Sequence, residues 1–336
     1  MILLLLALLT ACAANKEPPT VTIENNGVAV SFPPGIQMIG ENAYYVENDG
    51  VSFCGLTDCL AEKDGQLLYF TENSSLRRFS TGFVSIDGGL YYAPEDGFAL
   101  CAAREQVVQI DGALYAFDAD CRVMHLTAGV QEIFGSLYYV PEDGTLIALP
   151  QEGALLTGDG LYYANADGTL ARNRTLGYLR FGADGRYTSG SETLDQQVDA
   201  LLETAQVSRT DPIEDFRLCY AYIRDNYRYL SMEHYPAGST DWAQSSAETF
   251  FELGKGNCYC WAAAQMYCAR RLGFQAYCVA GWEDNPSNDH AWVMAEIDGT
   301  EYLFDAELEY ALDESADMFM ATSDGSTYNG YSYFFP

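Results

Sequence analysis

Residues 254–274 read GKGNCYCWAAAQMYCARRLGF and place three cysteines close together. We expect a helix over residues 258–272, because Asn257 is a good N-cap and Gly273 is a typical helix stop. Gly256 permits a close approach of the chain just before this helix. Cys258 and Cys260 lie in its first turn, where the helix dipole favours a thiolate. They point to opposite sides of the helix, so only one of them can face a given cleft.

Three strands are expected after this helix, over residues 275–282, 290–297 and 300–308, and the last two are joined by a two-residue Asp-Gly turn. Such a turn fixes the register of the hairpin. The expected facing pairs are Ile297 with Thr300, Trp292 with Asp305, and His290 with Glu307. His290 and Asp305 are then diagonal neighbours on one face, whereas a three-residue loop would move Asp305 to the other face. A cysteine nucleophile needs such a base, and the base needs an orienting partner.

The segments GNCYCWAAAQMYCARRLGF, AYCVAGW and DHAWVMAEIDGTEYLFDAE follow one another in this order. Together they resemble the transglutaminase-like superfamily of papain-type folds, over roughly residues 206–310. The resemblance implies a C-terminal α+β domain in which Cys258 is the nucleophile and His290 is the general base and acid. Asp305 is then the residue that orients the imidazole, and Cys260 is displaced from the nucleophile position.

Two features of this site are left open by the sequence. Glu307 follows Asp305 closely, where the family often has proline or a similar residue, and it is a competing partner for the imidazole. The backbone N–H of Cys258 can serve as an oxyanion donor, and Gln244 and Trp242 are the side chains to consider for the same role. No metal and no organic cofactor is implied by these residues.

The helices that lead into this domain are marked by their caps. Residues 191–205 begin with a Ser/Thr-type cap, residues 211–230 begin with Asp-Pro, and residues 246–254 end at a glycine. The expected division of the chain is a signal peptide over 1–11, a lipidated tether and entry strand over 12–39, a β-hairpin repeat domain over 40–190, and the helical lead-in with the transglutaminase-like domain over 191–336.

Residues 40–187 contain a repeated unit, whose leading aromatic residues are Tyr44, Tyr69, Tyr91, Tyr115, Tyr138 and Tyr162. Each unit indicates a strand, an Asp-Gly-type turn and a second strand, which is a β-hairpin. One hairpin cannot bury its own face, so the array must stack, and it is too short for a closed propeller. We expect an all-β array that forms a curled meander or a solenoid. The units loosely resemble choline- and cell-wall-binding repeats, which implies glycan binding; packing of tyrosines between hairpins is the alternative.

Charge and the N-terminal residues indicate the compartment. The 336 residues carry a formal charge of −31 at a sequence pI near 4.1, which argues against nucleic-acid binding. MILLLLALL at residues 1–9 has the length of a signal-peptide core and is too short to span a bilayer. LTAC at residues 9–12 resembles a bacterial lipobox, which implies lipid attachment at Cys12 and a place on the extracellular face of the cytoplasmic membrane; an ordinary cleaved signal would give a secreted protein instead.

Nine cysteines remain after Cys12, and export permits disulfides. The odd number predicts at least one free thiol, and a local Cys54–Cys59 bridge is one candidate.

These features predict a membrane-tethered cysteine enzyme that transfers acyl groups from peptide or side-chain amides, with hydrolysis favoured over cross-linking. Its partners would be a peptide or protein substrate, the membrane through the lipid anchor, and a cell-wall glycan as a further candidate. One alternative is a noncatalytic lipoprotein that binds envelope glycan or protein through the tyrosine-rich repeats. Another is a purely structural envelope lipoprotein.

Overall fold

The computed structural model describes residues 24–25, 28–29, 31–50, 52–313, 315–325 and 327–336. The expected signal peptide over 1–11 and the lipid attachment residue Cys12 lie outside these residues. The chain divides into two compact units, Met1–Leu149 and Pro150–Pro336. Among the helices of the described residues, none has the length and apolar character needed to cross a membrane.

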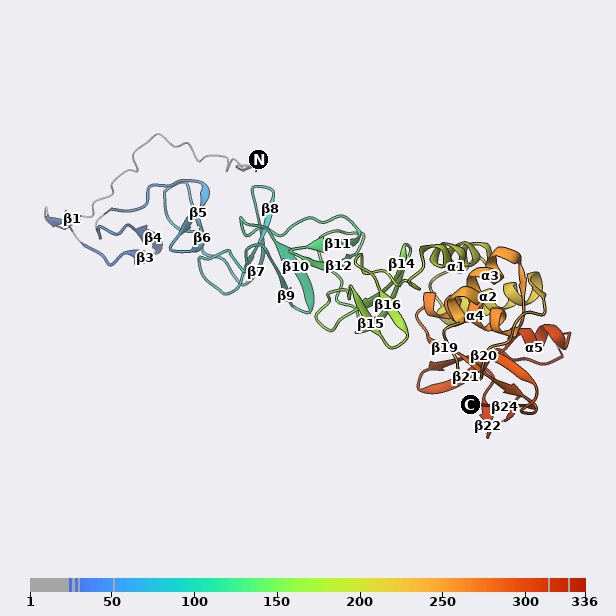
Figure 1. Ribbon diagram of the computed structural model, residues 1–336. Helices are drawn as coiled ribbons and strands as arrows, with labels where there is room; N and C mark the ends of the chain where they lie inside the picture. The colour runs from blue at the N-terminus through green and yellow to red at the C-terminus, as the bar shows by residue number, and fades with distance from the viewer. Residues whose placement is uncertain (1–23, 26–27, 30, 51, 314, 326) are drawn as a thin grey trace. The chain divides into compact units, whose positions relative to one another are not determined.

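The first unit consists of separate two-stranded antiparallel hairpins, which confirms the predicted hairpin array (Figure 1). The hairpins are β1 (Glu24–Asn25) with β2 (Val28–Ala29), β3 (Gly35–Ile39) with β4 (Asn42–Val46), β5 (Cys59–Lys63) with β6 (Gln66–Phe70), β7 (Gly82–Ile86) with β8 (Gly89–Ala93), β9 (Gln106–Ile110) with β10 (Ala113–Phe117), and β11 (Gly129–Ile133) with β12 (Ser136–Val140).

The pairing within each unit differs from the expectation. The tyrosine-containing strand pairs with the strand before it, as β6 does with β5, and not with the segment after it. The tight turn is therefore the preceding one, where Asp64-Gly65 and Asp87-Gly88 have positive φ at both residues, as type I′ turns require. The segment after the tyrosines makes only isolated bridges, such as Phe70 with Leu76.

The segments that follow the tyrosine strands join each hairpin to the previous one. The Leu76 N–H donates to the carbonyl of Ala43 in β4 at 2.7 Å, and the Leu100 N–H donates to Leu67 in β6 at 3.0 Å. Tyr91 and Tyr138 are buried among aliphatic side chains, so these tyrosines pack between hairpins.

One disulfide, Cys101–Cys121, joins the loops that follow β8 and β10. Cys54 is a buried thiol, so the local Cys54–Cys59 bridge considered from the sequence is not formed.

The second unit begins with two further hairpins, β13 (Gly153–Thr157) with β14 (Gly160–Ala164) and β15 (Arg174–Leu176) with β16 (Leu179–Phe181). The helices that follow are α1 (Glu192–Thr204), α2 (Pro212–Asn226), α3 (Ala243–Leu253), α4 (Cys258–Arg271) and α5 (Ala306–Ala311). The predicted signals act as expected: Ser191 and Asp211 cap α1 and α2, and Gly254 ends α3 in the left-handed conformation. The helix α2 stops at Asn226, because residues 228–229 form β17 (Arg228–Tyr229) beside β18 (Lys255–Gly256).

A six-stranded sheet lies against α4, in the order β21-β20-β19-β24-β23-β22. Its strands are β19 (Gln275–Glu283), β20 (Asp289–Ile297), β21 (Thr300–Phe304), β22 (Ser323–Asp324), β23 (Thr327–Tyr328) and β24 (Tyr331–Phe334). The predicted register is confirmed, since Ile297 pairs with Thr300 and Val293 with Phe304. The third predicted strand is shorter than expected, because Asp305 leaves the sheet and caps α5.

Gly256 lies where the chain enters α4, and its replacement tests the close approach predicted there. A Cβ at this position would collide with Cys260 and would lie 2.9 Å from the ring of Phe250. We expect Gly256→Ala to lower the free energy of unfolding by about 1–3 kcal/mol, as overpacking does. Urea denaturation measures this loss. Gly158→Ala is the control, because that Cβ would meet nothing within 4 Å; an equal loss in both variants would contradict the prediction.

Candidate active site

Cys258 is the first residue of α4, and local chemistry fixes the helix start. The Asn257 side chain accepts a hydrogen bond from the Cys260 N–H at 3.4 Å and donates one to the Glu233 carbonyl at 3.0 Å. Asn257 is therefore tied both to the helix and to the loop before α3. Cys258 is 4 % exposed and lines a cavity of about 410 Å³.

His290 and Asp305 meet at the other side of this cavity. His290 is the second residue of β20, and its Nε2 lies 2.7 Å from Asp305 Oδ2. The other carboxylate oxygen of Asp305 accepts the Leu308 N–H at 3.0 Å, which is the N-cap bond of α5. Asp305 thus starts a helix and binds the imidazole with the same side chain, and the structure brings Cys258, His290 and Asp305 together.

Tyr333 is a member of this site that the sequence did not reveal. Its hydroxyl donates to Asp305 Oδ2 at 2.7 Å. The hydroxyl reaches that oxygen because β24 adds to the edge of β19, where Tyr333 pairs with Glu283. No local signal in residues 327–336 indicates this pairing, which joins segments about fifty positions apart.

For both His290 and Asp305, burial and the charge of the partner shift the pKa in opposite directions. Burial alone would lower the pKa of His290, but the charge and hydrogen bond of Asp305, and then Cys258, raise it well above its ordinary value. Burial alone would raise the pKa of Asp305, but His290 and the hydrogen bonds from Leu308 and Tyr333 lower it. The site therefore favours an imidazolium held by a carboxylate.

Acidic side chains share the cavity with the thiol. Glu283, Glu307 and Asp289 line it, and no lysine or arginine is found among its described lining residues. Burial raises the pKa of Glu307 to about 7, and burial also raises the pKa of Glu283. Glu307 does not take the place of Asp305: its Oε2 lies 3.9 Å from the opposite ring nitrogen, His290 Nδ1.

The other thiols of this domain lie elsewhere. Cys260 faces the side of α4 opposite to the cavity, beside Met232 and Ser246, as the helical spacing predicted. Burial raises the pKa of Cys260, and it raises that of Cys278 to about 12. A hydrogen bond with Cys219, followed by burial, raises the pKa of Cys268. These groups are held as protonated core thiols.

The two side chains considered as oxyanion donors do not reach the cavity. Gln244 is exposed on α3 and donates to Glu248 at 3.2 Å. The Trp242 indole donates to the Ser239 carbonyl at 2.7 Å. The backbone N–H of Cys258, at a helix N-terminus, remains the candidate donor.

His290, Asp305 and Glu307 are the group of described residues whose ligand atoms lie close enough for a metal, within 4.8 Å of one another. Both oxygens of Asp305 already accept hydrogen bonds, and Nε2 of His290 is committed to one of them. A metal ion would have to displace this arrangement.

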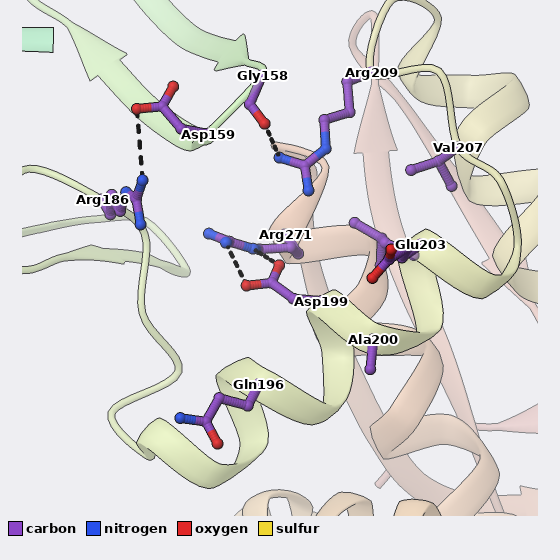
Figure 2. A pocket seen from close by; sticks show the side chains of 11 residues that line it. Gly158, Asp159, Arg186, Gln196, Asp199, Ala200, Glu203, Val207, Arg209 and Arg271 are labelled. Carbon is purple, nitrogen blue, oxygen red and sulfur yellow. Dashed lines mark hydrogen bonds and ion pairs between the residues drawn. The ribbon is translucent and has the colours of Figure 1, made fainter.

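A second cavity of about 590 Å³ lies between α1 and the β13–β14 turn (Figure 2). Four of its charged groups form two ion pairs: Arg271 pairs with Asp199 at 2.7 Å, and Arg186 with Asp159 at 3.5 Å. Arg209 donates to the Gly158 carbonyl at 3.2 Å. No cysteine or histidine occurs among the described residues that line it, so the cavity beside Cys258 is the candidate reaction site.

Residues 199–305 match the Transglutaminase-like superfamily. The chain contains a transglutaminase-like domain. The match spans α1 to Asp305 and includes Cys258 and His290, in agreement with the resemblance of the sequence motifs. Comparison with curated proteins finds no match.

Several solved structures resemble part of the chain at low sequence identity. Choline binding protein F from Streptococcus pneumoniae is 19 % identical at a TM-score of 0.32, covering 46 % of this chain and 48 % of that chain. CbpJ from Streptococcus pneumoniae is 15 % identical at a TM-score of 0.31, with the same coverage. Truncated alternansucrase from Leuconostoc mesenteroides is 22 % identical at a TM-score of 0.21, covering 44 % and 11 %. The match spans about half the length of the choline-binding proteins.

Tyr333→Phe tests the hydroxyl that supports Asp305. Removing a donor from a buried carboxylate costs about 1–3 kcal/mol, so we expect a corresponding loss in the free energy of unfolding at neutral pH. The loss should shrink in acid, because the stability that Asp305 contributes disappears as the pH falls through its lowered pKa. Chemical denaturation at several pH values measures both effects. Tyr328→Phe, a buried tyrosine of the neighbouring strand, should show no such pH dependence.

Proposed function

We propose that the transglutaminase-like domain is a cysteine acyl-transfer enzyme that hydrolyses peptide or side-chain amides. Cys258 is the nucleophile, His290 is the general base and acid, and Asp305 orients the imidazole. The observation that carries this proposal is the 2.7 Å bond from His290 to buried Asp305, beside the cavity that Cys258 lines. The family match, over residues 199–305, supports a cysteine-type enzyme.

The reaction would proceed in two steps. The Cys258 thiolate attacks the amide carbonyl, and the resulting oxyanion is bound by backbone N–H groups at the start of α4. The imidazolium then protonates the leaving amine, the carbon–nitrogen bond breaks, and a thioester with Cys258 remains. Water, deprotonated by His290, attacks the thioester and releases the acid. Hydrolysis is proposed because no described residue that lines the cavity specifies an acceptor amine.

The enzyme is proposed to act outside the cell on a peptide or protein, held to the membrane by a lipid at Cys12. The Cys101–Cys121 disulfide supports this location, because such bonds persist in oxidising compartments. Hydrolysis releases a free amine and an acid, whereas cross-linking would join the acyl group to an added amine, so product analysis by mass spectrometry distinguishes the two outcomes.

Alkylation by iodoacetamide, followed by peptide mass spectrometry, tests the nucleophile. We expect Cys258 to be labelled much faster than Cys260 or Cys268 at neutral pH. Burial raises the pKa of Cys260, and a hydrogen bond with Cys219, followed by burial, raises that of Cys268. The labelling of Cys258 should fall in His290→Ala and persist in His234→Ala, a matched variant at the rim of the same cavity. Slow labelling of Cys258 in reduced, folded protein, or equal rates in both variants, would refute a Cys–His pair.

A second candidate function is binding of cell-wall glycan by the hairpins. It is supported by a cluster of aromatic rings around Phe83, which is 39 % exposed. The centroid of the Phe83 ring lies 5.0 Å from that of Tyr92 and 4.7 Å from that of Tyr115. Aromatic rings of this kind stack on sugars and cations. We expect Phe83→Ala to reduce co-sedimentation with purified cell walls. Exposed Phe134→Ala is the control, and equal retention of both variants and the wild type would contradict this role.

A further inference from the structure

The imidazole of His290 lies between two carboxylates. Asp305 contacts Nε2 at 2.7 Å, and Glu307 Oε2 lies 3.9 Å from Nδ1. The two acids come from one short segment, because Asp305 caps α5 and Glu307 is in the first turn of that helix. The side chain of Glu307 is 13 % exposed, so solvent screens the interaction only weakly.

Among the described residues that line the cavity around Glu307, the two histidines are the groups that can carry a positive charge. The titratable groups that face it or share its cavity are His290 on β20, Asp305 at the end of β21, Glu283 on β19, Tyr229 on β17, Cys258 on α4, Tyr310 on α5, and His234 with Asp289 at the rim. Among these described residues, His290 is the nearest group that can balance a charge on Glu307, and His234 lies beside Asp289 at 3.7 Å.

We propose that Glu307 is a positioning residue that acts through His290, as a second carboxylate partner on the nitrogen opposite Asp305, and keeps the imidazolium charged toward alkaline pH. This proposal rests on the proposed function for its consequence, since the imidazolium must supply the proton of the leaving amine. The effect of Glu307 on the charge of the His290 ring does not depend on enzyme activity.

The direction in which Glu307 shifts the titration of His290 follows from the charges of the two groups. Burial places the pKa of Glu307 at about 7, so this carboxylate is charged mainly above neutral pH. A charged carboxylate stabilises the imidazolium and raises the pH at which the ring loses its proton. Below neutral pH, Glu307 is protonated and Asp305 acts alone. Glu307 should therefore extend the alkaline limb of activity and leave the acid limb unchanged.

Histidine side-chain NMR of the full chain measures this effect directly, since the chain has only three histidines. His125→Gln and His234→Gln assign the three ring signals. We expect Glu307→Gln, which keeps the shape of the side chain, to lower the titration midpoint of His290 by about 1–3 pH units. In the wild type, the His290 signal should also show a smaller step near pH 7, when Glu307 itself ionises.

Asp289→Asn is the matched control, because it removes a charge from the same cavity next to His234. It should leave the titration midpoint of His290 in place. An unchanged His290 midpoint in folded Glu307→Gln, together with no step in the wild type, would overturn the proposal. If the midpoint moves but Cys258 is unreactive, the role of Glu307 stands and the enzyme function fails. If a peptide substrate is found, the alkaline limb of kcat/KM should move with the midpoint.

Discussion

The buried pair of His290 and Asp305 is the constraint around which the C-terminal domain is arranged. A carboxylate taken out of water is costly unless hydrogen bonds and an opposite charge compensate it. Asp305 receives the imidazole of His290, the backbone N–H of Leu308 and the hydroxyl of Tyr333. These donors come from β20, α5 and β24, so a single carboxylate links three parts of the domain. Loss of any one donor leaves part of a buried charge unsatisfied.

The side chains around α4 also distinguish its two N-terminal thiols. The helix begins at Asn257, and its first turn presents Cys258 to the cavity and Cys260 to the opposite side. Burial raises the pKa of Cys260 and so favours its protonated form. Only the thiol next to His290 faces both a base and a cavity. Both cysteines lie in the first turn of α4, but only Cys258 shares its cavity with His290 of the sheet.

In the first unit, short local turns form the individual hairpins. Asp64-Gly65 and similar pairs adopt positive φ at both residues and close each hairpin without help from distant residues. Each hairpin is too small to bury its own face, so backbone bonds such as Leu76 to Ala43 and buried tyrosines such as Tyr91 join it to its neighbours. Buried tyrosines of the repeat thus pack between hairpins, whereas the aromatic rings of Phe83 and Phe134 are exposed.

The sequence by itself determined the features that depend on neighbouring residues. The caps at Asn257 and Ser191, the Asp298-Gly299 register and the opposite directions of Cys258 and Cys260 follow from rules within one element or one turn. The hairpin register also placed His290 and Asp305 on one face, whereas the choice of Cys258 over Cys260 was implied only by the family resemblance.

Only the tertiary structure decided what depends on contacts between distant segments. Tyr333 reaches Asp305 because β24 joins the edge of β19, and no periodicity in the sequence signals that pairing. Glu307 lies at Nδ1 of His290 because the strand ends at Phe304 and the chain turns into α5. From the sequence, each tyrosine strand was expected to pair with the segment after it, across an Asp-Gly-type turn. The structure has the backward pairing, in which a two-residue turn, such as Asp64-Gly65 or Asp87-Gly88, joins each tyrosine strand to the strand before it.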